Sequence, residues 1–189
     1  MSAGAYTPLQ RALHWIVAAL VIVLIPAGLL IEGYDPEVAA RVNGALGAGA
    51  FDLIYDLHKS AGLTVLGLMI LRAAARAARP PAPHDPPLRA WERAASRIVH
   101  LLLYALLIAA PVVGWIGVSL YPAPAPVWFL FDARLPLTPD RALSETLLGQ
   151  VHGPMGVMIG LLAAAHVLAA LKHAFIDRDG VMRRMLGGG

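Results

Sequence analysis

Four long apolar stretches divide this sequence, and they limit the folds that it can adopt. The first of them, residues 12–31, contains no charged residue. At about 1.5 Å per helical residue it would cross the roughly 30 Å of a bilayer's hydrocarbon core. Hydrophobic residues make up 58% of the 189 residues and charged residues only 14%, which excludes an ordinary soluble domain. We therefore expect an all-α integral membrane protein, a four-transmembrane-helix bundle that forms a single domain over residues 1–189.

We expect the four helices at about 8–31, 54–78, 93–120 and 147–175. Thr7, with Gln10 three residues later, is a capping signal for the first helix. A cleaved signal peptide is the alternative for this helix, but its apolar run is longer than the ~7 to 15 residues of a signal sequence. The second helix is less obvious, because its charge-free stretch, 60–71, has only 12 residues. That helix must therefore include the flanking Lys59 and Arg72.

The charges of the loops predict the orientation of the bundle. Segment 72–97 holds six Arg against two acids, and the tail from Lys172 onward holds four bases against two acids, so both are expected in the cytoplasm together with both termini. Segments 32–59 and 132–145 hold eight acids against four bases and are expected outside. His84, in the basic loop, is expected to be a loop residue. This placement explains the pI of about 9.6 without nucleic acid as a partner.

Four histidines then fall into two pairs. His152 and His166 are 14 residues apart, which on a helix is about 21 Å of rise and an offset of only about 40°. His14 should lie at the level of His166, near the cytoplasmic side, and His58 at the level of His152, near the outer side. The chain has no cysteine, which excludes iron–sulfur clusters and covalently attached haem.

We interpret the pairs as axial ligands of two b-type haems. A packing role, a proton relay or a transported metal ion remains an alternative, although a metal site would usually recruit a carboxylate or thiolate as well, and the charge-free stretches contain neither.

Other residues near these levels are candidates for cofactor binding. Arg72, 14 residues after His58, should reach the cytoplasmic haem level, where a propionate could pair with it, or it could snorkel to the surface. His100 and His173 lie near the cytoplasmic ends of their helices and could contact a propionate or a quinone head group, or be solvated. Small residues follow the outer histidines and either leave room for a porphyrin or pack helices together; they are Gly62, Gly153, Gly156 and Gly160.

At this point the chain resembles the bacterial di-haem cytochrome b561 family, inner-membrane cytochromes that include superoxide oxidase. The resemblance covers nearly the whole length and rests on Arg11-Ala-Leu-His14-Trp15, His58-Lys59-Ser60-Ala61-Gly62 with Leu71-Arg72, His100-Leu-Leu-Leu-Tyr104, Pro111-Val-Val-Gly114-Trp115, Val151-His152 and Ala165-His166. It implies that the four histidines are the haem ligands, that superoxide is oxidised at the outer surface and that ubiquinone accepts the electrons in the bacterial inner membrane. Gly153-Pro154 stands where the family commonly has Glu after the histidine, so a carboxylate beside the outer haem is expected to be missing.

The leading interpretation is thus a superoxide:quinone oxidoreductase, in which Lys59, one residue from a ligand, could attract the anion. Its competitor is a non-enzymatic electron conduit between the quinone pool and a dehydrogenase or periplasmic redox partner. Such a partner protein could dock on segment 121–145, which carries Trp128, Phe129 and Phe131. A histidine-lined metal transporter or a haem-free scaffold is a third class.

Overall fold

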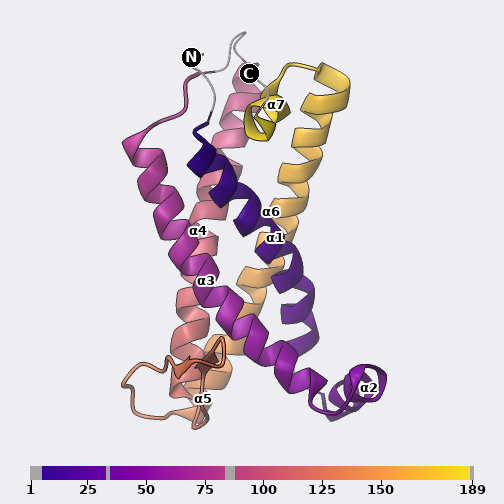
Figure 1. Ribbon diagram of the computed structural model, residues 1–189, viewed down its shortest axis with the longest axis vertical. Coiled ribbons are helices and arrows are strands. Elements are labelled where there is room, and N and C mark those ends of the chain that lie inside the picture. The colour runs from indigo at the N-terminus through magenta and orange to yellow at the C-terminus, as the bar shows by residue number, and fades with distance from the viewer. Residues whose placement is uncertain (1–5, 33–34, 84–87, 188–189) are drawn as a thin grey trace.

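Four long helices run side by side and form the bundle expected from the sequence (Figure 1). The computed structural model describes residues 6–32, 35–83 and 88–187, so the loop residue His84 lies outside the described residues. The long helices are α1 (Pro8–Ile31), α3 (Ala50–Ala78), α4 (Ala90–Leu120) and a continuous helical segment Arg141–Asp177. Each of the four is long and apolar enough to cross a membrane.

The fourth span is not a uniform α-helix. It consists of α5 (Arg141–Glu145), the π-helical η1 (Thr146–His152), α6 (Gly153–Lys172) and the π-helical η2 (His173–Asp177). Pro154 has no N–H to donate to the carbonyl of Gln150, four residues earlier, and this missing bond falls at the junction of η1 and α6. Short π-helical turns inside α-helices are frequent at functional sites. His152 is the last residue of such a turn.

The expected helix boundaries differ from the observed ones by three to six residues at several ends. α3 begins at Ala50 and not at 54. It follows Gly49 (φ 81°), the Asn43 side chain accepts the Phe51 N–H, and Asp52 in the first turn complements the helix dipole. α4 begins at Ala90 and not at 93, where Glu92 accepts a bond from the Arg89 backbone. The last span extends over Arg141–Asp177 and not only 147–175.

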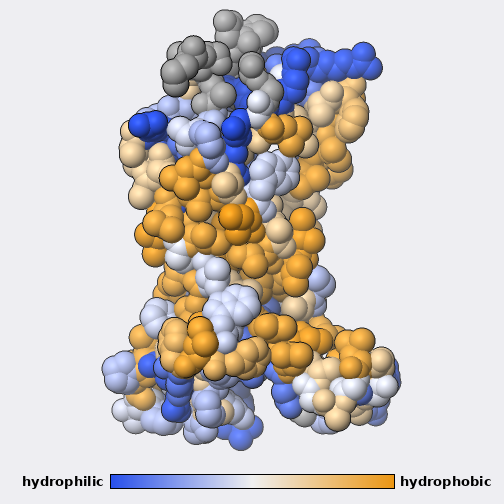
Figure 2. All heavy atoms as spheres, viewed as in Figure 1, coloured by the Kyte–Doolittle hydropathy of each residue, from blue (hydrophilic) through white to orange (hydrophobic). Residues whose placement is uncertain are grey.

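Four short elements were not expected from the sequence. α2 (Pro36–Leu46) is capped by the Asp35 side chain, and α7 (Val181–Leu186) follows the last span. The strands β1 (Pro126–Val127) and β2 (Phe131–Asp132) form an antiparallel hairpin in which Val127 pairs with Phe131. The hairpin, α2 and α5 lie at one end of the bundle and both chain termini at the other (Figure 1). The space-filling view shows an apolar band between two hydrophilic ends (Figure 2).

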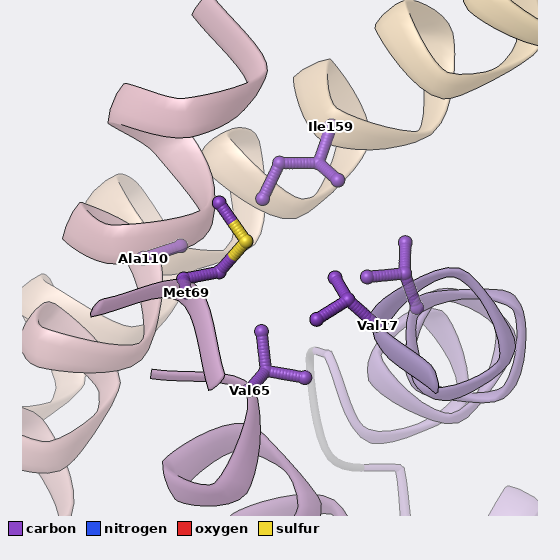
Figure 3. Close-up of a cluster of buried hydrophobic side chains, with 6 residues drawn as sticks. Val17, Val65, Met69, Ala110 and Ile159 are labelled. Carbon is purple, nitrogen blue, oxygen red and sulfur yellow. The ribbon is translucent and has the colours of Figure 1, made fainter. Parts of the chain in front are cut away.

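The centre of the bundle is a small apolar cluster to which all four spans contribute. Its side chains point toward one another from α1, α3, α4 and α6 (Figure 3). They are Val17, Val21, Val65, Met69, Ala110 and Ile159, each less than a tenth exposed. At the end with the termini, Gln10 fixes α1 against α3, because its amide donates to the Ala75 and Arg79 carbonyls at 3.0 and 2.8 Å. The same Gln10 forms the expected capping box with Thr7.

Candidate functional site

The structure brings the four predicted histidines together as two pairs, one on each side of the central cluster. His58 of α3 faces His152 of η1, and we call these the outer pair. His14 of α1 faces His166 of α6, and we call these the inner pair. In both pairs the imidazole centroids are 6.1 Å apart, and the ring planes are nearly perpendicular, at 84° and 80°.

This spacing is suited to a metal between the rings. Imidazole nitrogens lie about 2.0 Å from a bound metal such as zinc, so two rings that ligate one metal from opposite sides have centroids roughly 6 Å apart. Among the described residues, the buried Nδ1 atoms of His14 and His58 have no partner at hydrogen-bond geometry. Unpaired buried polar atoms are rare and suggest a further bound group.

The rings of the outer pair are positioned by two glycines that the sequence reasoning did not single out as site residues. A Cβ on Gly114 of α4 would lie 2.9 Å from Cε1 and 3.0 Å from Nδ1 of His152, and a Cβ on Gly28 of α1 would lie 3.1 Å from Cε1 of His58. His152 Nδ1 is also 2.9 Å from the Ala110 carbonyl oxygen. Since that oxygen can only accept, Nδ1 carries the proton and Nε2 keeps its lone pair for a metal.

The inner pair has a third histidine and an arginine beside it. The His100 ring centroid lies 5.1 Å from that of His166, and its Nδ1 is 3.1 Å from the Ser96 hydroxyl. Arg72 lies with its guanidinium carbon 5.4 Å from the centre of the Tyr104 ring. Among the described residues Arg72 makes no ion pair with an acid, so its charge is available to an anionic group at this level. Tyr104 is a partner that the sequence reasoning did not assign.

The glycines expected to leave room near the outer pair differ in what surrounds them. A Cβ on Gly62 or Gly156 would meet nothing within 4 Å, whereas one on Gly160 would touch Ile25 in ordinary contact. A Cβ on Gly153 would collide with the carboxylate of Glu32. Although no acid follows His152 in the sequence, Glu32 after the end of α1 places its carboxylate in the space that a side chain at 153 would take.

Lys59 is less available than the sequence suggested. Its ammonium lies 2.7 Å from Asp56 and 4.7 Å from the centre of the Tyr55 ring, and its side chain is only 10% exposed. Asp56 balances its charge, so its long-range attraction for an anion is weak in this arrangement.

His173 is oriented toward the acids of the tail. Its Nδ1 lies 2.5 Å from Asp179 and 3.2 Å from Asp177. Asp177 also pairs with Lys172, whose ammonium is 2.9 Å from Glu92. Glu92, His173 and Asp177 bring ligand atoms within 4.8 Å of one another, but Lys172 already supplies a cation to these acids. Contact of His173 with a propionate or a quinone stays a prediction.

The fold and the paired histidines define a class of protein: small integral membrane proteins in which two pairs of imidazoles from different helices face each other within a four-helix bundle.

Comparison with known proteins gives the family. The sequence model of the family described as prokaryotic cytochrome b561 matches residues 5–188. Cytochrome b561 homolog 2 of Escherichia coli K12 is 29% identical over 185 residues, 96% of this chain and 91% of that protein. Cytochrome b561 homolog 1 of the same organism is 26% identical, covering 96% of each chain. The probable superoxide oxidase CybB of Yersinia pestis is 25% identical, covering 96% of this chain and 95% of that protein.

The chain belongs to the prokaryotic cytochrome b561 family. It is accordingly an electron-transfer protein of the bacterial inner membrane that crosses the bilayer several times, and b-type haem is the cofactor of its family.

Proposed function

We propose that the chain carries two b-type haems, one at each histidine pair, and transfers electrons across the membrane from superoxide at the outer end to ubiquinone. The observation that carries this proposal is the repeated 6.1 Å separation of two imidazoles from different helices, at two levels of one bundle. When bound, each haem would supply a centre that accepts and releases one electron. Two imidazole ligands leave no open position for dioxygen, which favours electron transfer over oxygen activation.

The protein's own contribution at the outer pair is to fix ring orientation. Gly114 allows α4 to approach the His152 ring, and the Ala110 carbonyl holds its Nδ1–H so that Nε2 points away from α4. Gly28 likewise allows α1 to approach the edge of the His58 ring. Fixed ligand rings need little reorganisation when charge changes at the site, and their outer partners tune ligand basicity.

At the inner pair, Arg72 is the residue that we assign to a haem propionate. Its guanidinium lies against the Tyr104 ring and has no acidic partner among the described residues. A guanidinium can bind a carboxylate through two parallel hydrogen bonds, which would offset the cost of its position in the span. His100, with its ring 5.1 Å from His166 and Nδ1 beside Ser96, is a second candidate for a propionate or a quinone head group.

The reaction that we propose balances as two superoxide anions and one ubiquinone with two protons, giving two dioxygen molecules and one ubiquinol. Support for superoxide as the donor comes from the family and from the relative in Yersinia pestis that is named a probable superoxide oxidase. The loop charges predict that the end of the bundle with α2 and α5 faces outward, so the proposal places the donor at that end.

Stopped-flow mixing of the purified, haem-loaded protein with superoxide tests the donor. We expect reduction of the b-type absorption bands to outrun spontaneous dismutation, and added ubiquinone to reoxidise them. Reduction slower than dismutation would exclude superoxide as the donor. The haem assignment would stand, because this experiment tests only the donor. A reducing protein partner would then be the candidate donor.

A further inference from the structure

The hairpin β1–β2 carries an exposed apolar tip. Four consecutive large side chains are exposed there: Trp128 by 43%, Phe129 by 60%, Leu130 by 80% and Phe131 by 59%. The sequence suggested that this segment could receive a partner protein. An exposed apolar patch in fact has two common uses, contact with another protein or with a membrane, and the hairpin's attachment decides between them.

The hairpin is fixed to the side of α3, within its transmembrane span. The Trp128 backbone N–H donates to the Ser60 hydroxyl at 2.8 Å, and the Trp128 indole N–H donates to the Thr64 hydroxyl at 3.1 Å. Thr64 lies six residues past His58, about 9 Å further along the helix toward the end with the termini. The next residue, Val65, belongs to the central apolar cluster. The tip is therefore folded back along the bundle, level with the apolar part of the span.

Three backbone N–H groups of the hairpin find partners within the protein, which an apolar solvent requires of backbone groups. The Trp128 N–H is bonded to Ser60, the Leu130 N–H to the Val127 carbonyl at 3.0 Å, and the Ala133 N–H to the Ala125 carbonyl at 3.1 Å. Trp128 and Phe129 both have positive φ, 50° and 59°. This conformation is uncommon for bulky residues, and a turn of this kind usually contains Asn and Gly. Here the turn presents apolar side chains outward.

Charge begins immediately after the tip. Asp132 and Arg134 form an exposed ion pair at 2.7 Å, and the Arg134 and Ala125 backbone N–H groups donate to Asp132. A tryptophan and apolar residues followed directly by charged ones is the order found where a chain passes from acyl chains into the headgroup layer.

We propose that residues 126–132 form a re-entrant hairpin whose tip, Trp128 to Phe131, inserts into the acyl chains of the lipid leaflet at the end of the bundle that carries α2 and α5. The occupant of this apolar surface is therefore lipid and not a soluble redox protein. The hairpin holds the loop between α4 and α5 against the turn of α3 that follows His58.

The chain has no cysteine, so single cysteines can report the depth of the tip directly. Leu130→Cys would carry a nitroxide label in the full-length, haem-loaded protein, reconstituted in phosphatidylcholine–phosphatidylglycerol vesicles. Ile22→Cys, 71% exposed in α1, is the control for a lipid-facing site, and Thr138→Cys, exposed in the same loop, is the control for a water-facing site. Relaxation by oxygen reports lipid exposure, and relaxation by a water-soluble nickel chelate reports water exposure.

We expect the oxygen-to-nickel ratio at position 130 to approach that at position 22 and to exceed that at position 138 several-fold. A ratio equal to that at position 138 would overturn the proposal, because the tip would then be in water and open to a soluble partner. Protection from both reagents would also overturn it, since the tip would then be covered by protein, a second copy of this chain included. None of these outcomes depends on the electron donor.

Discussion

Gly114 provides a sharp test of how the bundle holds the outer pair. A Cβ at this position would stand 2.9 and 3.0 Å from two atoms of the His152 ring, whereas carbon atoms in favourable contact are about 3.5–4.0 Å apart. In Gly114→Ala the ring must therefore move by roughly 0.5–1 Å, and its bond to the Ala110 carbonyl leaves little freedom to do so. Overpacking of this kind costs about 1–3 kcal/mol.

If that cost falls on haem binding, the affinity of the outer site drops roughly 5- to 150-fold, at 1.4 kcal/mol per tenfold. The assay is the haem-to-protein ratio and the reduced-minus-oxidised spectrum of purified protein. Gly67→Ala is the matched control, because Gly67 is on α3 and a Cβ there would meet nothing within 4 Å. Gly28→Ala should have a smaller effect than Gly114→Ala, since its contact with His58 is longer, at 3.1 Å. A Gly114→Ala protein with two haems and unchanged spectra would refute the reasoning.

Three further predictions concern charges. Glu32→Gln removes the carboxylate beside Gly153 and should raise the midpoint potential of the outer haem by tens of millivolts, where 59 mV corresponds to a tenfold change in the equilibrium constant of a one-electron reduction. An unchanged redox titration would show that Glu32 does not act on this haem. Arg72→Gln should lower the potential of the inner haem by a similar amount and Arg72→Lys by less, and a shift confined to the outer haem would contradict the propionate assignment. Asp56→Asn leaves the charge of Lys59 unbalanced and should accelerate reduction by superoxide, whereas Lys59→Gln leaves the charge of Asp56 unbalanced and should slow it by a similar factor. Equal rates in the two variants would show that this ion pair does not act on the approach of the anion.

Much of the fold could be predicted because a bilayer imposes length and polarity on each span. The apolar runs indicated all four spans, and the spacing of His152 and His166 indicated two levels on one helix face. The local capping signal of Thr7 and Gln10 indicated the start of α1, which the structure has at Pro8. These are features that a single segment determines by itself.

The remainder depends on contacts between segments that lie far apart in the sequence. Nothing local to Gly28 or Gly114 distinguishes them from other small residues of membrane helices, and their importance follows from the rings that pack on them. Glu32 was counted only as an acid of an outer loop, although it fills the space beside Gly153. The proline-rich segment gave no indication of the hairpin, and the hairpin's position depends on the hydroxyl groups of Ser60 and Thr64. The glycine of the motif Pro111-Val-Val-Gly114-Trp115 was the one available signal for the missed site residues.

The central claim is that each histidine pair holds one haem, and an anaerobic redox spectrum of the wild type beside four single variants tests it most directly. The variants are His14→Ala, His58→Ala, His152→Ala and His166→Ala. We predict that the wild type binds two b-type haems, that His14→Ala and His166→Ala lose or perturb the same haem, and that His58→Ala and His152→Ala lose or perturb the other. Two intact bis-imidazole centres in any of the four variants would contradict the account.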